Sequence, residues 1–184
     1  MQRANEAAEI GSFIIDLGVN SLRCSSNFAG FFGLQEVETQ SLFGTLARIH
    51  REDAARVCES YQVAARGEDG GRVNVEFKVD QPDGGIRWLA CRGRIEFRID
   101  DEGKRPHRIA GVCFDITDRK KAEASLRENA ELFQEIANVA PVLIWMSDTA
   151  KACTWFNKPW VDFTGRTMEE ELGDGWTEGV HPED

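Results

Sequence analysis

Cysteine and histidine are the residue types of this chain that could supply redox, metal or nucleophilic chemistry. The cysteines are five, an odd number, at Cys24, Cys58, Cys91, Cys113 and Cys153. No two of them stand at the short spacing of a zinc site or a redox-active pair. The histidines, His50, His107 and His181, are also far apart. We therefore expect no metal site, and we expect all the thiols to be reduced, as in a cytoplasmic protein.

Phosphoryl transfer and nucleophilic catalysis are two further possibilities that the sequence argues against. The sequence His-Arg-Glu-Asp at residues 50–53 is superficially similar to a phosphoacceptor box, but such a histidine lies in a long helix ahead of a phosphate-binding loop. The glycine-rich loop here, residues 67–71, contains two acidic residues. Cys113 has no histidine placed to act as its base. We expect no enzyme, and we expect His50 and Asp53 to orient the start of a helix.

The charge balance excludes several kinds of partner. Lys and Arg number 22 against 32 Asp and Glu, a formal charge of −10, and this field repels nucleic acid and anionic lipid. The longest apolar run, residues 139–146, is too short to span a bilayer, and residues 1–6 lack the apolar core of a signal peptide. We expect a soluble, cytoplasmic chain that binds neither nucleic acid nor membranes.

The first half of the chain begins with strand signals and continues with helical ones. Residues 11–17 form an apolar run that ends in a turn-like segment, and residues 22–25 follow it, which predicts two short strands in a hairpin. Residues 51–65 carry one apolar stripe at helical spacing and are followed by Gly67, where we expect the helix to stop.

Three long strands follow in the predicted domain. Residues 73–79 alternate apolar and polar side chains, and turn residues separate this strand from residues 86–99 and 108–116. The resulting antiparallel meander buries helices on one face. The sequence therefore predicts an α+β domain over residues 1–118.

A charged helix of about twenty residues, residues 119–138, is predicted to leave the sheet. Its heptad positions hold Ala122, Leu126, Asn129, Phe133 and Ile136. The first interpretation is a dimerising coiled coil in which a buried Asn129 fixes the register. The second is a monomeric, solvated spacer, and the sequence leaves both open.

The chain repeats itself at an offset of 132 residues. The matched pairs share residue type or shape: Phe13 with Trp145, Asp16 with Asp148, Phe28 with Trp160, Phe31 with Phe163, and Gly33 with Gly165. At an offset of 131, His50 and His181 each begin a His-x-Glu-Asp segment. Residues 139–184 are therefore predicted to be the first part of a second, truncated copy, which is less stable because it lacks the long strands.

The chain resembles the PAS superfamily, in particular the PAS modules with a PAC motif found in bacterial sensor histidine kinases. The resemblance is carried by residues 111–123, with the sequence GVCFDITDRKKAE, by residues 85–89, GIRWL, and by the two His-x-Glu-Asp segments. It implies a PAS fold followed by a signalling helix, and a two-component sensory module that passes a small-molecule, redox or energy signal to an output domain or partner protein. The relay would pass through Asp115, Ile116 and Thr117, and the helix would form the homodimer.

The resemblance does not name a cofactor, and the sequence argues against two. Flavin-binding relatives form an adduct with a cysteine ahead of the main helix, and residues 35–49 contain none. The glutamine that contacts the flavin in those relatives is matched here by Cys113, which lacks an amide. Haem-binding relatives carry an axial histidine in the segment matched by residues 51–65, where none occurs.

The candidate pocket residues lie on two strands. Ile109, Gly111 and Cys113 share one face, and Gly111 is expected to leave space beside the thiol. On the neighbouring strand either Ile86 with Trp88, or Leu89 with Cys91, faces inward, and the pattern does not decide between them. A ligand cavity and a solid core both remain open. So do two functions: a sensor of a small molecule, and a ligand-free relay that dimerises or binds a protein partner.

Overall fold

The computed structural model describes residues 10–34, 40–101, 103–181 and 183. The predictions that concern residues 1–6, Pro182 and Asp184 therefore lie outside the described residues. The chain divides after Lys121 into two compact units, each considered by itself.

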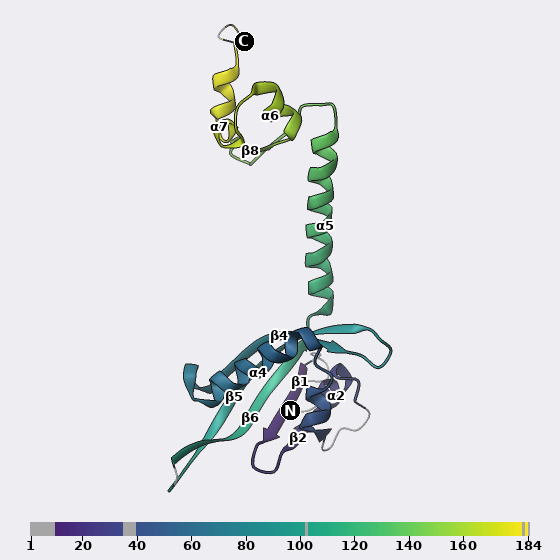
Figure 1. The fold of residues 1–184 in the computed structure, drawn as a ribbon, viewed down its shortest axis with the longest axis vertical. Helices are drawn as coiled ribbons and strands as arrows, with labels where there is room; N and C mark the ends of the chain where they lie inside the picture. Colours follow the sequence, from purple (N-terminus) through teal and green to yellow (C-terminus); the bar gives the residue numbers. More distant parts are fainter. Residues whose placement is uncertain (1–9, 35–39, 102, 182, 184) are drawn as a thin grey trace. The chain divides into compact units, whose positions relative to one another are not determined.

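The first unit is built on one antiparallel sheet with the strand order β3-β2-β1-β6-β5-β4 (Figure 1). Its strands are β1 (Ile10–Asp16), β2 (Ser21–Cys24), β3 (Gln40–Ser41), β4 (Arg72–Asp80), β5 (Ile86–Asp100) and β6 (Gly103–Asp115). The predicted meander is confirmed, but β6 begins earlier than predicted. It pairs with β5 from Gly103 onward, and a bulge beside Phe97 takes up the extra residue near Pro106, which has no N–H to donate.

Helices cover one face of this sheet. They are α2 (Ser26–Phe31), α3 (Leu42–Leu46) and α4 (Arg51–Ala65), followed by the short 3-10 helix η1 (Glu68–Gly71). The α4 prediction is confirmed at both ends, and Gly67 adopts the left-handed conformation, with a φ of 83°, that suits a residue just beyond a helix end. The predicted α+β fold with helices on one sheet face is confirmed.

Hydrogen bonds attach the start of α4 to β4. Asp53 is buried and accepts hydrogen bonds from the backbone N–H of Lys78 (2.8 Å) and from the guanidinium of Arg56 (2.6 Å). Burial alone would raise the pKa of Asp53, but these hydrogen bonds lower it below its usual value. His50 precedes the helix, and its ring lies 2.7 Å from a carboxylate oxygen of Asp80. Both residues therefore orient the helix.

Close backbone approach brings α2 onto the sheet. A Cβ atom at Gly11 of β1 would lie 2.8 Å from the Cα of Phe28, so only glycine allows this contact. Phe28 then stacks between Phe13 of β1 (5.2 Å between ring centroids) and Phe32 (4.7 Å). This aromatic cluster joins the helices to the sheet in the core.

The predicted charged helix is α5 (Thr117–Val139), and from Ala122 onward it belongs to the second unit. Its elements are β7 (Trp145–Ser147), β8 (Cys153–Phe156), α6 (Lys158–Thr164), α7 (Met168–Glu171) and the 3-10 helix η2 (Gly175–Gly179). Three residues of these elements, Cys153, Phe156 and Glu171, are buried. The described part of this unit contains a two-stranded sheet and no counterpart of the long meander.

The sequence repeat is matched by a repeat in geometry. Ser25 caps α2 and accepts hydrogen bonds from the N–H groups of Phe28 and Ser12, and Asn157 caps α6 in the same way. The partners of Asn157 are Trp160 and Ile144, at the same offset of 132 residues as the caps themselves. The backbone angles of the two caps are nearly identical, with φ of −77° and −78° and ψ of 164° in both. The two segments therefore share one local design.

The described part of the chain contains neither a membrane-spanning helix nor a metal-binding cluster. No helix there combines the length and apolar character needed to cross a membrane. Nor do three or more histidine, cysteine or acidic side chains gather there in a way that could hold a metal ion.

Candidate functional site

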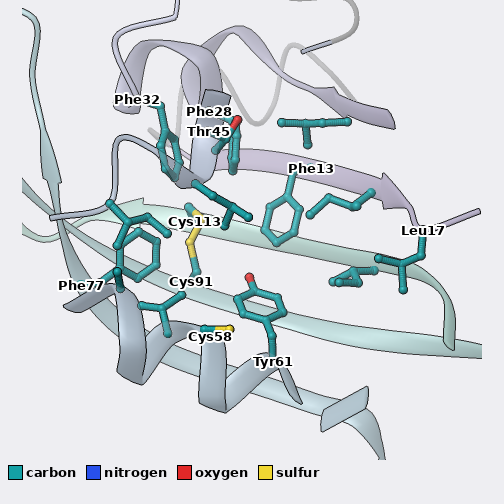
Figure 2. A pocket seen from close by; sticks show the side chains of 17 residues that line it. Phe13, Leu17, Phe28, Phe32, Thr45, Cys58, Tyr61, Phe77, Cys91 and Cys113 are labelled. Carbon is teal, nitrogen blue, oxygen red and sulfur yellow. A yellow bond between two sulfur atoms is a disulfide. The ribbon is translucent and has the colours of Figure 1, made fainter. Parts of the chain in front are cut away.

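An apolar cavity of about 340 Å³ lies in the first unit, between the sheet and the helices (Figure 2). Most of its lining is aliphatic or aromatic: Phe13, Ile15, Leu17, Leu22, Phe28, Phe32, Thr45, Leu46, Ile49, Ala54, Val57, Cys58, Tyr61, Phe77, Cys91, Ile109 and Cys113. The volume falls within the range of small-molecule pockets, which are typically apolar with a few polar groups. The open question of cavity or solid core is thus answered in favour of a cavity.

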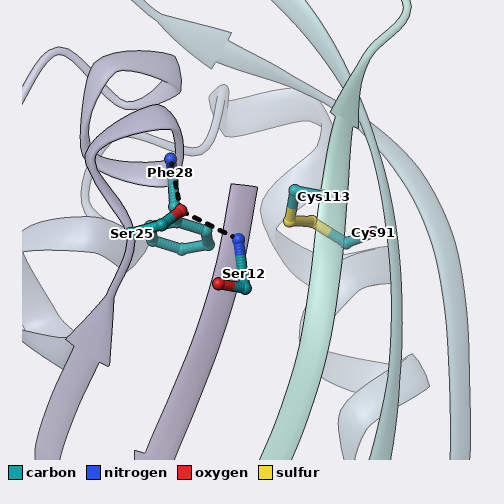
Figure 3. The surroundings of a disulfide bond; sticks show 5 residues. All are labelled: Ser12, Ser25, Phe28, Cys91 and Cys113. Carbon is teal, nitrogen blue, oxygen red and sulfur yellow. Dashed lines mark hydrogen bonds between the residues drawn. A yellow bond between two sulfur atoms is a disulfide. The ribbon is translucent and has the colours of Figure 1, made fainter. Parts of the chain in front are cut away.

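The sheet wall of this cavity contains a disulfide between Cys91 of β5 and Cys113 of β6 (Figure 3). The expectation that all thiols are reduced was wrong for this pair. The two residues stand directly opposite each other in the strand register, with both side chains buried on the same sheet face. A separation of 22 residues hides this from any search for short cysteine spacings. Cys24, Cys58 and Cys153 are not disulfide-bonded in the described part of the chain.

The structure brings three of the six predicted pocket residues into the lining: Cys91, Ile109 and Cys113. Leu89 is fully buried on the same side of β5 but lies outside the lining. Gly111 leaves no open space, because a Cβ there would lie 2.7 Å from the ring of Phe13.

Trp88 has a different environment from the other predicted pocket residues. Its ring is approached by the ammonium groups of Lys78 and Lys120, at 5.5 and 5.3 Å from the ring centroid. Because β-strand side chains alternate, Leu89 with Cys91 is the inward-facing set, and Trp88 faces away from the core.

Several lining residues were not predicted as pocket residues. Ala54, Val57, Cys58 and Tyr61 belong to the apolar stripe that predicted α4, so the stripe itself was the available signal. Thr45 lies in a region without periodicity, and the sequence held no signal for it. Tyr61 is the single tyrosine of the chain. Burial among apolar atoms raises the pKa of its phenol to about 12, so the group is neutral at physiological pH.

The strands that line the cavity also hold the start of α5. The side chain of Thr117 accepts a hydrogen bond from the backbone N–H of Trp88 (3.0 Å), and the N–H of Ile116 donates to the carbonyl of Trp88 (2.9 Å). Asp115 accepts from the N–H of Thr117 (2.9 Å) and lies 3.3 Å from the guanidinium of Arg87. The three predicted relay residues therefore lie together where β6 becomes α5. They line an open polar hollow beside α2, separate from the apolar cavity.

Ion pairs add a second attachment for the first turns of α5. Glu76 of β4 lies 2.6 Å from the guanidinium of Arg119 and 2.9 Å from the ammonium of Lys120. The hydrogen bond from Lys120, followed by that from Arg119, lowers the pKa of Glu76. Both ends of this contact lie in the first unit, so β4 and α5 are directly connected.

Comparison with known proteins identifies the fold. The family model described as "PAS fold" matches residues 21–113, about half of the chain. The chain belongs to the PAS family.

Individual relatives agree with this assignment. An uncharacterized protein, y4lL, of Sinorhizobium fredii is 33% identical over 142 residues, covering 77% of this chain and 16% of the relative. A blue-light-activated histidine kinase of Brucella anthropi is 27% identical over 124 residues, covering 67% of this chain and 24% of the relative. The chain thus spans a quarter or less of the length of these two curated relatives.

A solved structure shows the same architecture. The sensory box histidine kinase/response regulator of Burkholderia thailandensis has a TM-score of 0.59 and 26% identity, with 73% of this chain and 97% of that chain covered. The chain is therefore a PAS sensory domain homologous to the sensor domains of histidine kinases.

The helix that follows this PAS domain has an exposed apolar row. Among the five predicted seam residues, Leu126, Phe133 and Ile136 are large and exposed, and Ala122 and Asn129 are exposed as well. Phe133 lies beside Trp155 of the same unit, with 6.0 Å between the ring centroids. The structure is of one chain, so whether a second copy covers this row stays a prediction.

Proposed function

We propose that this PAS domain is a sensory input module in which occupancy of the apolar cavity is passed through α5 to an output domain encoded outside this sequence. The histidine kinase relatives support a kinase as that output domain. The module itself has no catalytic role in this proposal. Because a kinase output consumes ATP, the proposal also places the module in the cytoplasm.

One observation carries the proposal: the strands that line the cavity are the strands that hold α5. Phe77 of β4, Cys91 of β5 and Cys113 of β6 line the cavity, and Glu76 and Trp88 bond the start of α5 from β4 and β5. A ligand that shifts these strands by a fraction of an ångström changes the geometry at Thr117. Packed elements transmit such shifts because they have few alternative arrangements.

The repeat supports the proposed organisation of the chain. Residues 1–118 form the PAS domain with its PAC motif, residues 119–138 the linker helix, and residues 139–184 the first part of a second PAS domain. The matched caps at Ser25 and Asn157, and the matched turns in which Asp16 and Asp148 accept backbone hydrogen bonds, are the basis for this assignment.

Native mass spectrometry of freshly purified protein tests the sensor proposal. Wild type should carry an additional small-molecule mass that is lost on denaturation. Cys58→Trp should lack it, because Cys58 is an exposed lining residue of α4 and a larger side chain there blocks entry. Glu59→Trp is the matched control, because Glu59 is exposed on the same helix and lies outside the lining. If all three proteins are bare, also after incubation with a cell extract, the sensor proposal is wrong.

The exposed apolar row of α5 favours a second candidate, a ligand-free relay that works by dimerisation. Leu126 is 73% exposed in the single chain, and full burial of a side chain of this size is worth about 1.5–3 kcal/mol. Leu126→Glu removes this burial in both protomers and brings like charges together, so it should weaken the dimer by orders of magnitude.

Arg127→Glu is the control for this prediction. Arg127 is exposed and forms a 3.7 Å ion pair with Glu131, and exposed pairs are worth about 1 kcal/mol or less. Sedimentation equilibrium compares the two variants. A Leu126→Glu chain that is as dimeric as wild type would show that α5 does not form the interface.

A further inference from the structure

The cavity is lined by uncharged side chains only. Of its seventeen lining residues none is acidic, basic or a histidine. A charged group of a ligand would lose its hydration on entering the cavity and would find no opposite charge there. This is strongly unfavourable in an apolar surrounding. The uncharged lining therefore selects against anions and cations, and this makes the proposed sensory function more specific.

Two hydroxyl groups are the polar features of the lining. Figure 2 shows the ring of Tyr61 rising from α4 with its hydroxyl directed into the cavity. No hydrogen bond links this hydroxyl to any other described residue. Thr45 lies across the cavity from it on α3; its side chain is 5% exposed, and its Oγ1 is buried with no hydrogen-bond partner in the structure. The two hydroxyls therefore differ: the Thr45 oxygen has almost no accessible surface, so a molecule in the cavity cannot reach it, whereas a ligand oxygen could pair with the Tyr61 hydroxyl.

The protonated hydroxyl of Tyr61 favours a ligand oxygen that accepts a hydrogen bond. The raised pKa keeps the phenol protonated, so it can donate one hydrogen bond, as the threonine hydroxyl can. A carbonyl oxygen can accept the hydrogen bond from the phenol. A carboxylate could accept as well, but it brings a charge that no lining residue neutralises.

The size and shape of the cavity limit the rest of the ligand. At about 30 Å³ for each water-sized group, the cavity of about 340 Å³ holds roughly eleven non-hydrogen atoms. Four phenylalanine rings line it: Phe13, Phe28, Phe32 and Phe77. Such walls favour a flat aromatic or a compact aliphatic body.

The route of entry is also visible. Leu46 of α3 and Ala54 and Cys58 of α4 line the cavity and are exposed to solvent. The cavity therefore opens between these two helices, and a small molecule can enter without unfolding of the sheet.

We propose that the cavity binds an uncharged, mainly apolar carbonyl compound of about this size, whose oxygen accepts a hydrogen bond from the Tyr61 hydroxyl. This inference rests on the proposed sensory function. Three compounds of matched shape test it: benzylacetone, a neutral ketone; hydrocinnamate, in which a carboxylate oxygen replaces the methyl group; and isopentylbenzene, which has no oxygen.

Nuclear magnetic resonance of the chain with tyrosine isotope-labelled at Cζ gives a site-specific measurement. Since Tyr61 is the only tyrosine, the spectrum holds one signal, and it reports the environment of the hydroxyl. Benzylacetone should shift this signal and saturate. Hydrocinnamate should bind roughly a hundredfold more weakly, because its charge must be desolvated. Isopentylbenzene should bind roughly fivefold more weakly, because it leaves the Tyr61 hydroxyl without a partner.

Variants test the role of the Tyr61 hydroxyl, with calorimetry as the measurement because Tyr61→Phe removes the labelled residue. Tyr61→Phe should weaken benzylacetone roughly fivefold and leave isopentylbenzene nearly unchanged, whereas Thr45→Val, which removes the inaccessible hydroxyl, should leave both nearly unchanged. Thermal melting verifies that both variants fold.

Three outcomes overturn the inference and differ in what they say about the proposed function. Equal affinity for the ketone and the carboxylate, or ketone binding that is indifferent to Tyr61→Phe, would contradict the carbonyl assignment while leaving a ligand-binding cavity. Binding of none of the three compounds, together with bare protein in native mass spectrometry, would overturn both the inference and the sensory function.

Discussion

The two units of this chain use the same local structure and bury it to very different degrees. Phe13 of β1 and Trp145 of β7 are equivalent in the repeat, and each ring packs against its equivalent helix residue, at 5.2 Å for Phe13–Phe28 and 5.8 Å for Trp145–Trp160. Yet Phe13 is 4% exposed and Trp145 is 56% exposed. The difference in burial comes from β6, which in the first unit pairs with β1 along the whole length of β1.

This comparison separates what local sequence specifies from what a sheet supplies. A capping side chain, a turn aspartate and a left-handed glycine recur in both units, and each acts within a few residues of itself. The cavity, by contrast, needs the long strands, because Cys91, Ile109 and Cys113 form its sheet wall. A hairpin with one helix can therefore form without the sensory site.

Truncation of the equivalent rings should show this difference most strongly. Phe13→Ala should lower the free energy of unfolding of the first unit by about 3–5 kcal/mol, because a large ring is removed from a closed core. Trp145→Ala should lower stability by about 1 kcal/mol or less, because most of its ring already faces solvent. Urea unfolding followed by circular dichroism compares the two. Equal losses would mean that Trp145 is covered, for example by a second copy of the chain.

The disulfide belongs to the first unit alone and gives the next largest effect. Reduction of Cys91–Cys113, which closes a loop with a sequence separation of 22, should lower stability by about 3 kcal/mol through the added freedom of the unfolded chain. Urea unfolding with and without dithiothreitol measures it. The double variant Cys91→Ala, Cys113→Ala should be insensitive to the reductant, whereas Cys153→Ala, which alters a free thiol of the second unit, should respond as wild type does. A wild type indifferent to reductant would show that the pair is reduced in solution.

The smallest effect at neutral pH concerns Tyr61. Its pKa is raised to about 12 by burial in the folded chain, against about 10 in an unfolded one, so the folded state holds the proton more tightly. The stability that this contributes is fully present below pH 10 and is lost as pH rises from about 10 to 12. A phenolate absorbance titration, unambiguous with one tyrosine, should have its midpoint near 12 in native protein and near 10 in urea. A native midpoint near 10 would mean that the hydroxyl is solvated.

The sequence was sufficient to predict an element or an equivalent position wherever its pattern was periodic or repeated. The stripe containing Val57 and Tyr61 predicted α4 and, with it, one wall of the cavity, and the repeat identified the equivalent positions of Phe13 and Trp145. The residues of the sheet that face the cavity were harder to predict. Strand alternation placed Ile109 and Cys113 on one face but left the face of β5 open, because Trp88 and Leu89 are both apolar.

The remaining features depend on tertiary register, which a single sequence does not contain. Cys91 and Cys113 form a disulfide because β5 and β6 pair with one particular alignment, and a shift by one residue would separate them. Gly111 indicated free space on sequence grounds, but the ring of Phe13 arrives there from another strand. Thr45 enters the site from a short helix without a periodic signature.

Hydrogen–deuterium exchange of the whole chain, with and without saturating benzylacetone, tests most directly whether the cavity is coupled to α5. The account predicts slower exchange in β5 and β6, a change at residues 117–120 where Trp88 and Glu76 hold the helix, and no change in β7 and β8. The Cys58→Trp variant, with its entrance blocked, should show none of these changes. Protection confined to the cavity strands, with unaltered exchange at residues 117–120, would contradict the proposed relay.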